Sequence, residues 1–125
     1  MFKILIIEDE KAMSDLITLK FQVEGYDVVQ AFTLSEAKEK IIPGAGFNAI
    51  LTDYLLPDGS LIDFLTVLRT SSEFAKIPIV VMTNYVEDLN IDQLKSLGVV
   101  DIFVKYQVVP AQMVEKINGV ISDHV

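Results

Sequence analysis

The chain has 125 residues, 51% of them hydrophobic, and its mean hydropathy of +0.43 argues against an intrinsically disordered chain. Its 18 acidic and 10 basic residues give a net charge of −8, which disfavours direct binding to DNA or RNA and favours a basic partner or a bound cation. No cysteine is present, so disulfides and thiol chemistry are excluded. The first apolar run is too short for a signal peptide or a membrane span. We therefore expect a cytoplasmic protein with no membrane contact, formed by one domain over residues 1–125.

The first half of the chain alternates between strand and helix patterns. Ile4–Ile7 is a continuous apolar run, as expected for a strand that is covered on both faces. Apolar residues at helical spacing follow in Lys11–Glu24, and Tyr26–Phe32 is rich in β-branched and aromatic residues, which indicates a second strand. Thr33–Glu36 has the pattern of a capping box and predicts a helix that ends before Pro43.

The second half continues this alternation. Its predicted strands are Phe47–Thr52, Ile77–Met82 and Val99–Val104. Its predicted helices begin at the capping box Ser60–Asp63, lie around Asp92–Leu97, and begin near Pro110. Five strands that each precede a helix predict an α/β fold of (βα)5 type, a doubly wound parallel sheet with helices on both faces. Ligands of such sheets bind at the carboxyl ends of the strands.

Charged and polar residues stand where four of the predicted strands end. Glu8 and Asp9 follow the first strand, Asp53 the third, Thr83 the fourth and Lys105 the fifth. Three carboxylates at one edge repel one another unless a cation joins them, and oxygen ligands suit Mg²⁺ (or Mn²⁺). A metal, an ammonium and a hydroxyl around one carboxylate form a cradle for phosphoryl oxygens, and a carboxylate can itself accept a phosphoryl group.

Each of these residues also has a structural interpretation when it is taken alone. Asp9 is suited to cap the first helix, Thr83 is an ordinary strand residue, and a lone Lys105 would be solvated. Asp53 is not needed as a cap, because Ser60 is better placed to cap the next helix. The convergence of all these residues on one edge favours the functional interpretation.

These residues resemble the receiver domain of two-component response regulators, over the whole chain, and in particular the single-domain, chemotaxis-regulator type. The resemblance is carried by the segments IIEDE, LTDYLLPDG, IVVMT and DIFVK, in this order and at the spacing of the family. It implies a flavodoxin-like strand order 2-1-3-4-5. It also implies Asp53 as phosphoacceptor, Thr83 as the hydroxyl that moves to the phosphoryl group, and Lys105 as the paired cation. The metal ligands that it implies are Glu8, Asp9, Asp53 and the backbone carbonyl of Leu55.

The resemblance also implies partners. A sensor histidine kinase or a histidine phosphotransfer protein would supply the phosphoryl group. A downstream protein would bind the face of the fourth helix, fifth strand and fifth helix. Four apolar residues around the predicted edge strand suggest a contact there, with a partner or in a homodimer, unless the last helix covers them: Val100, Ile102, Val108 and Val109.

The sequence departs from the family near two of the strand ends. Ile102 stands where the family carries a Tyr or Phe switch residue, and Phe103, one position further, is expected to point into the core. Tyr106 replaces the proline that usually follows the lysine, and its peptide bond is expected to be trans. Asn84 and Tyr85 follow the hydroxyl residue, where we expect them to narrow the access of water and so lengthen the life of the phosphate.

Four functions compete on these observations. The preferred one is a stand-alone phosphoaccepting module that catalyses only its own phosphorylation and dephosphorylation and acts through protein contacts. The alternative is a pseudo-receiver that binds partners without phosphate, which Ile102 and Tyr106 keep open. An aspartyl-phosphate hydrolase would need a second Asp where Leu55 stands. A flavin carrier would need a phosphate loop where the acidic Glu8–Glu10 stands.

Overall fold

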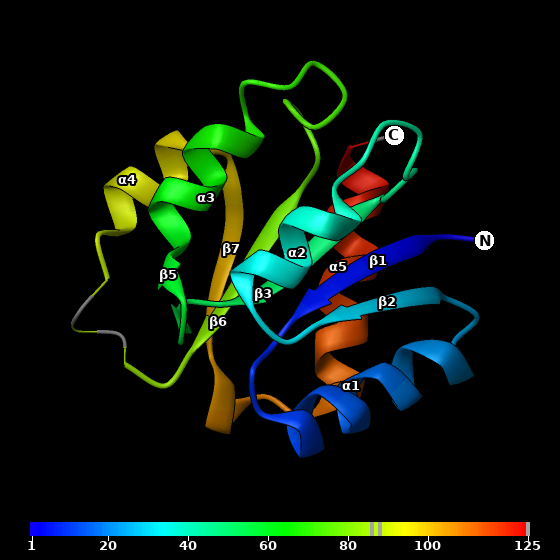
Figure 1. Cartoon of the computed structure of the whole chain (residues 1–125). Helices are drawn as coiled ribbons and strands as arrows, with labels where there is room; N and C mark the ends of the chain where they lie inside the picture. Colours follow the sequence, from blue (N-terminus) through cyan, green and yellow to red (C-terminus); the bar gives the residue numbers. More distant parts are fainter. Residues whose placement is uncertain (86, 88, 125) are drawn as a thin grey trace.

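A five-stranded parallel sheet with helices on both faces forms the protein, as the computed structural model shows (Figure 1). The structure describes residues 1–85, 87 and 89–124. The sheet has the order β2-β1-β3-β6-β7, with strands β1 (Lys3–Ile7), β2 (Asp27–Ala31), β3 (Ala49–Asp53), β6 (Ile79–Thr83) and β7 (Val99–Val104). The helices are α1 (Lys11–Val23), α2 (Leu34–Lys40), α3 (Leu61–Leu68), α4 (Ile91–Ser96) and α5 (Pro110–Asp123). The predicted doubly wound α/β fold and the flavodoxin-like order of its five strands are confirmed.

Two apolar cores lie on the two faces of the sheet. One core joins the sheet to α2, α3 and α4, and the other joins it to α1 and α5 (Figure 1). The three central strands are therefore covered on both sides, which explains why their sequences are continuous apolar runs. β2 and β7 form the edges of the sheet.

Helix starts and strand ends follow local signals in the sequence. The predicted caps are present: the hydroxyl of Thr33 accepts a hydrogen bond from the backbone N–H of Glu36 at 3.0 Å, and that of Ser60 accepts one from Asp63 at 3.2 Å. The predicted bounds of the Val99–Val104 strand match β7. β3 and β6 begin two residues later than predicted, and each continues by one residue, so that Asp53 and Thr83 are the last residues of their strands.

A small hairpin that the sequence did not reveal follows β3. β4 (Leu55–Leu56) pairs with β5 (Gly59–Ser60). The carboxylate of Asp58 accepts hydrogen bonds from the backbone N–H groups of Leu34 and Ser35, at 2.8 and 2.9 Å. These bonds lower the pKa of Asp58 and tie the loop after Asp53 to the start of α2.

An apolar stripe on the outer side of α1 is exposed. The periodic residues that indicated this helix include Leu16, Leu19 and Val23, whose side chains are 54%, 60% and 70% exposed. The buried face consists instead of Ser14, Ile17, Thr18 and Phe21. The helix was thus correctly predicted, but it carries apolar residues on two faces, and only one of them packs on the sheet. Among the residues that the structure describes, no helix is both long and apolar enough to cross a membrane.

Candidate functional site

The carboxyl ends of four neighbouring strands bring the predicted site residues together (Figure 1). Glu8 follows β1, Asp53 ends β3, and Thr83 ends β6 opposite Val104 of β7. Lys105 is the first residue of the short 3₁₀ turn η2 (Lys105–Gln107), which follows β7 directly. Four of these side chains, those of Glu8, Asp53, Thr83 and Lys105, are buried, whereas that of Asp9 is exposed.

Lys105 is the central group of this site. Its ammonium donates hydrogen bonds to both carboxylate oxygens of Glu8 and to Oδ2 of Asp53, each at 2.8 Å. All three donor protons of the ammonium are therefore used. The pairing of Lys105 with Asp53 was predicted, whereas its bond to both oxygens of Glu8 was not. One positive charge faces two buried carboxylates, so this buried cluster carries a net negative charge when both are ionised.

The charge imbalance appears in the pKa values of the cluster. Burial, together with the nearby charge of Asp53, raises the pKa of Glu8 to about 7, although the hydrogen bond from Lys105 opposes the rise. Burial alone would lower the pKa of Lys105, but its hydrogen bonds to Asp53 and Glu8 outweigh this effect and raise it. The pKa of Glu8 stays raised because the single ammonium, which Glu8 shares with Asp53, does not offset the cost of burying its carboxylate.

We expect the stability of the metal-free protein to fall as the pH rises from about 5 to about 7.5. The folded state holds the Glu8 proton more tightly than the unfolded state, so the stabilisation present at low pH is lost as Glu8 ionises. The free energy of unfolding should fall by about 2–3 kcal/mol, an order of magnitude that follows from the shift. Urea unfolding of the wild type and of Glu8→Gln across this range measures the effect. Parallel profiles of the two proteins would contradict the assignment to Glu8.

The donor set of this site fits a divalent cation. Glu8, Asp9 and Asp53 each offer a carboxylate oxygen, and these oxygens lie within 4.8 Å of one another. Carboxylate oxygens are the ligands that Mg²⁺ prefers, and the cation would balance the excess negative charge of the cluster, which adds to burial in raising the pKa of Glu8. The backbone N–H of Leu55 lies 3.4 Å from Oδ1 of Asp53. A metal contact of the Leu55 carbonyl remains a prediction.

The loop after β6 contacts the site and the neighbouring loop. The hydroxyl of Thr83 accepts a hydrogen bond from the backbone N–H of Tyr85 at 3.1 Å. The side-chain oxygen of Asn84 accepts one from the backbone N–H of Tyr106, also at 3.1 Å. The peptide bond before Tyr106 is trans, as expected. The rings of Tyr85 and Tyr106 are largely exposed.

The two residues at the position of the missing aromatic switch face opposite sides of the sheet. Phe103 is buried in the core beneath α1 and α5, as predicted. Ile102 packs against the core under α2, α3 and α4, so the last helix does not cover it. Ile102 also lines a shallow hollow of about 380 Å³ between α4 and β7, together with the exposed Val100. Val109 is exposed as well, while Val108 packs on the α1–α5 side.

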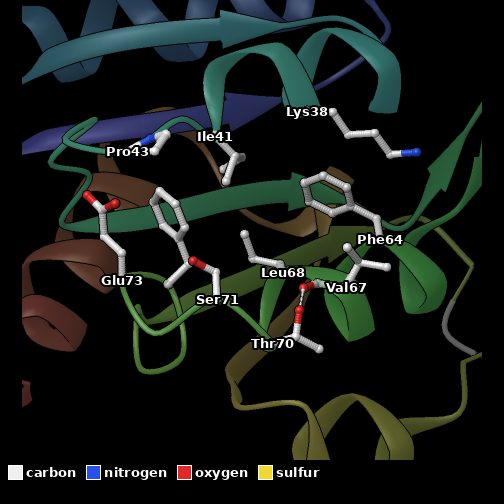
Figure 2. A pocket seen from close by; sticks show the side chains of 10 residues that line it. Lys38, Ile41, Pro43, Phe64, Val67, Leu68, Thr70, Ser71 and Glu73 are labelled. Carbon is white, nitrogen blue, oxygen red and sulfur yellow. Dashed lines mark hydrogen bonds between the residues drawn. The ribbon is translucent and has the colours of Figure 1, made fainter.

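A second cavity, of about 340 Å³, lies away from the acidic site, between the ends of α2 and α3 (Figure 2). Its walls are apolar, with Ile41, Phe64 and Leu68 pointing inward, while Lys38 and Glu73 stand at opposite ends. The carboxylate of Glu73 accepts the backbone N–H of Gly44 at 2.9 Å. The cavity holds no cluster of reactive groups, so we place the chemistry at the strand ends.

The fold and this cluster define a class of protein, a doubly wound α/β domain with an acidic, lysine-paired site at its carboxyl edge. The sequence matches the family of response regulator receiver domains over residues 4–118. The chain therefore belongs to this family, whose members are signalling modules of two-component systems and typically bind Mg²⁺.

Individual relatives and solved structures agree with this assignment. The chain is 28% identical to chemotaxis protein CheY1 of Helicobacter pylori over 96% of its length and 97% of that protein. It is 27% identical to the phosphate regulon transcriptional regulatory protein PhoB of Escherichia coli, but matches only 51% of that longer protein. Its structure is similar to a CheY-like receiver domain protein of Methanospirillum hungatei, with a TM-score of 0.88, 27% identity and coverage of 98% and 95% of the two chains.

Proposed function

We propose that this receiver domain accepts a phosphoryl group on Asp53 and thereby changes a protein-binding surface. The observation that carries the proposal is the buried carboxylate of Asp53, held by the Lys105 ammonium beside Glu8 and Asp9. This arrangement supplies a nucleophile, a fixed cation and a set of metal ligands at one point. Thr83, at the end of the adjacent strand, supplies a hydroxyl.

The proposed reaction transfers the phosphoryl group from a phosphohistidine of a partner. A carboxylate oxygen of Asp53 forms the new P–O bond while the P–N bond breaks, and the electron pair returns to the imidazole nitrogen, which takes a proton from solvent. The ammonium of Lys105 exchanges one of its contacts with Glu8 or Asp53 for a phosphoryl oxygen, and the hydroxyl of Thr83 donates a hydrogen bond to another. Later, water attacks the phosphorus and releases inorganic phosphate and the free carboxylate, so the protein catalyses only its own phosphorylation and dephosphorylation.

Glu8, Asp9, Asp53 and the carbonyl of Leu55 would hold Mg²⁺ in this reaction. When bound, the ion neutralises charge on the phosphoryl oxygens. Residues of the chain orient the nucleophile and control the access of water. Lys105 fixes the direction of the Asp53 carboxylate through the 2.8 Å contact, and the exposed Asn84 and Tyr85 flank the access of water to the phosphate.

Two surfaces are suited to the proposed partners. The exposed apolar stripe Leu16–Leu19–Val23 runs along α1, which begins beside the site, and we propose that it contacts the histidine kinase or phosphotransfer protein. The hollow between α4 and β7, with α5 beyond it, is the proposed surface for the downstream partner or for a homodimer. The acidic net charge favours partners with basic contact surfaces.

Intact mass spectrometry after incubation with acetyl phosphate and Mg²⁺ tests the proposed function. We expect the wild type to gain one phosphoryl group, and we expect no gain without Mg²⁺ or in Asp53→Asn. The variant Asp63→Asn, which changes an exposed acid of α3, serves as a matched control and should be phosphorylated like the wild type. If the folded wild type binds Mg²⁺ but gains no mass, the phosphoacceptor role fails and a phosphate-independent binding module replaces it.

A further inference from the structure

The side chain of Asn84 joins two loops that carry groups of the site. The last pair in the ladder between β6 and β7 is Thr83 opposite Val104. One residue beyond this pair, the side-chain oxygen of Asn84 accepts the backbone N–H of Tyr106 at 3.1 Å. Asn84 directly follows the hydroxyl residue, and Tyr106 directly follows Lys105. The bond therefore extends the contact between the two strands into the loops.

The N–H of Tyr106 has no acceptor within its own turn. It lies in the 3₁₀ turn η2, and the first N–H groups of a helical turn lack an acceptor inside that turn. The residue before the turn, Val104, makes no capping hydrogen bond with its side chain. Asn84 thus caps η2 from a neighbouring loop. A proline at position 106 would carry no N–H and could not make this bond.

We propose that Asn84 is a positioning residue for Lys105. By holding the N–H of Tyr106, it fixes the backbone from which the Lys105 side chain reaches Glu8 and Asp53. The same bond couples Thr83 to Lys105, because a displacement of the loop after β6 is transmitted through Asn84 to η2. The two groups that would contact a phosphoryl group therefore move together, and the exposed ring of Tyr106 moves with them. The consequence for phosphorylation rests on the proposed function, whereas the coupling of Asn84 to Lys105 does not.

Hydrogen exchange of the Lys105 ammonium, measured by NMR on the metal-free protein, tests the coupling without phosphorylation. Asn84→Ala removes the acceptor, and Tyr106→Pro removes the donor. We expect each variant to accelerate the exchange by about two- to tenfold, the factor that corresponds to the net strength of one exposed hydrogen bond. Because both variants break one bond, the double variant should be no faster than the faster single variant.

A further variant separates the bond from the other role of Tyr106. Tyr106→Ala removes the ring but keeps the backbone N–H, so it should exchange like the wild type. Unchanged exchange in Asn84→Ala would overturn the proposal, as would additive effects of Asn84→Ala and Tyr106→Pro. In acetyl phosphate assays, Asn84→Ala should also slow phosphorylation by about two- to tenfold. A wild type that is not phosphorylated would refute the proposed function, and the ammonium exchange would still decide the coupling.

Discussion

Replacement of Lys105 by Met is expected to slow phosphorylation of Asp53 by about a hundredfold and to destabilise the protein. The ammonium is the only cation within hydrogen-bonding distance of both carboxylates among the described residues, and removal of one fixed charge that stabilises a transition state costs about 10²–10³ in rate. The same change leaves the buried Glu8 and Asp53 without a counterion. The loss of one partner of a buried ion pair costs about 3–5 kcal/mol.

The destabilisation should depend on pH. Without Lys105 the pKa of Glu8 rises further. The loss in free energy of unfolding is therefore larger at pH 8, where Glu8 must either ionise without a counterion or bind a proton from dilute solution, than at pH 5.5, where Glu8 is protonated. Urea unfolding at the two pH values without divalent ions measures this difference. Lys76→Met, which removes an exposed lysine, is the matched control and should change the free energy of unfolding by less than about 0.5 kcal/mol. Equal stability of Lys105→Met and the wild type at pH 8 would contradict the proposed role of the ammonium.

Replacement of Arg69 by Met is expected to lower the free energy of unfolding by about 2–3 kcal/mol. The guanidinium donates to the backbone carbonyls of Leu97, Phe74 and Gly98 at 2.7, 2.8 and 3.2 Å, and so ties the end of α3 to the loops that precede β6 and β7. Hydrogen bonds from a charged group contribute about 1.5–3 kcal/mol each in favourable cases, and water replaces part of this loss at the exposed carbonyl of Gly98.

Arg69→Lys distinguishes geometry from charge. A lysine keeps the positive charge but lacks the planar fork that reaches three carbonyls, so it should recover less than half of the lost stability. The site lies at the opposite ends of β6 and β7, and both variants, once folded, should be phosphorylated by acetyl phosphate at the wild-type rate. If neither variant loses more than about 0.5 kcal/mol in urea unfolding, the three contacts do not contribute to stability.

The fold could be predicted because its local signals agree with one another. Continuous apolar runs marked the buried central strands, and the caps at Thr33 and Ser60 marked where two helices begin. Parallel strands bring their carboxyl ends to one edge, so the meeting of Glu8, Asp53 and Lys105 followed from the order of elements alone.

The remaining features depend on tertiary geometry that periodicity does not contain. A helix with apolar residues on two faces does not reveal which face is buried, and the exposure of Leu16 and Leu19 follows from where α1 meets the sheet. The bond of Lys105 to both oxygens of Glu8 depends on side-chain placement in the folded site. The sequence indicates the contact between Asn84 and Tyr106 only weakly. Asn84 lies one position beyond the end of β6 and Tyr106 two positions beyond the end of β7, which places them near each other but does not predict a hydrogen bond.

The most direct test of the central claim is to identify the residue that carries the phosphoryl group. The wild type is phosphorylated with acetyl phosphate and Mg²⁺, reduced with borohydride, which converts an acyl phosphate of Asp to homoserine, and digested for peptide mapping. The proposed mechanism predicts homoserine at position 53 and at no other acid. Homoserine at Asp9 instead, or unmodified Asp53 in a folded protein that binds Mg²⁺, would contradict it.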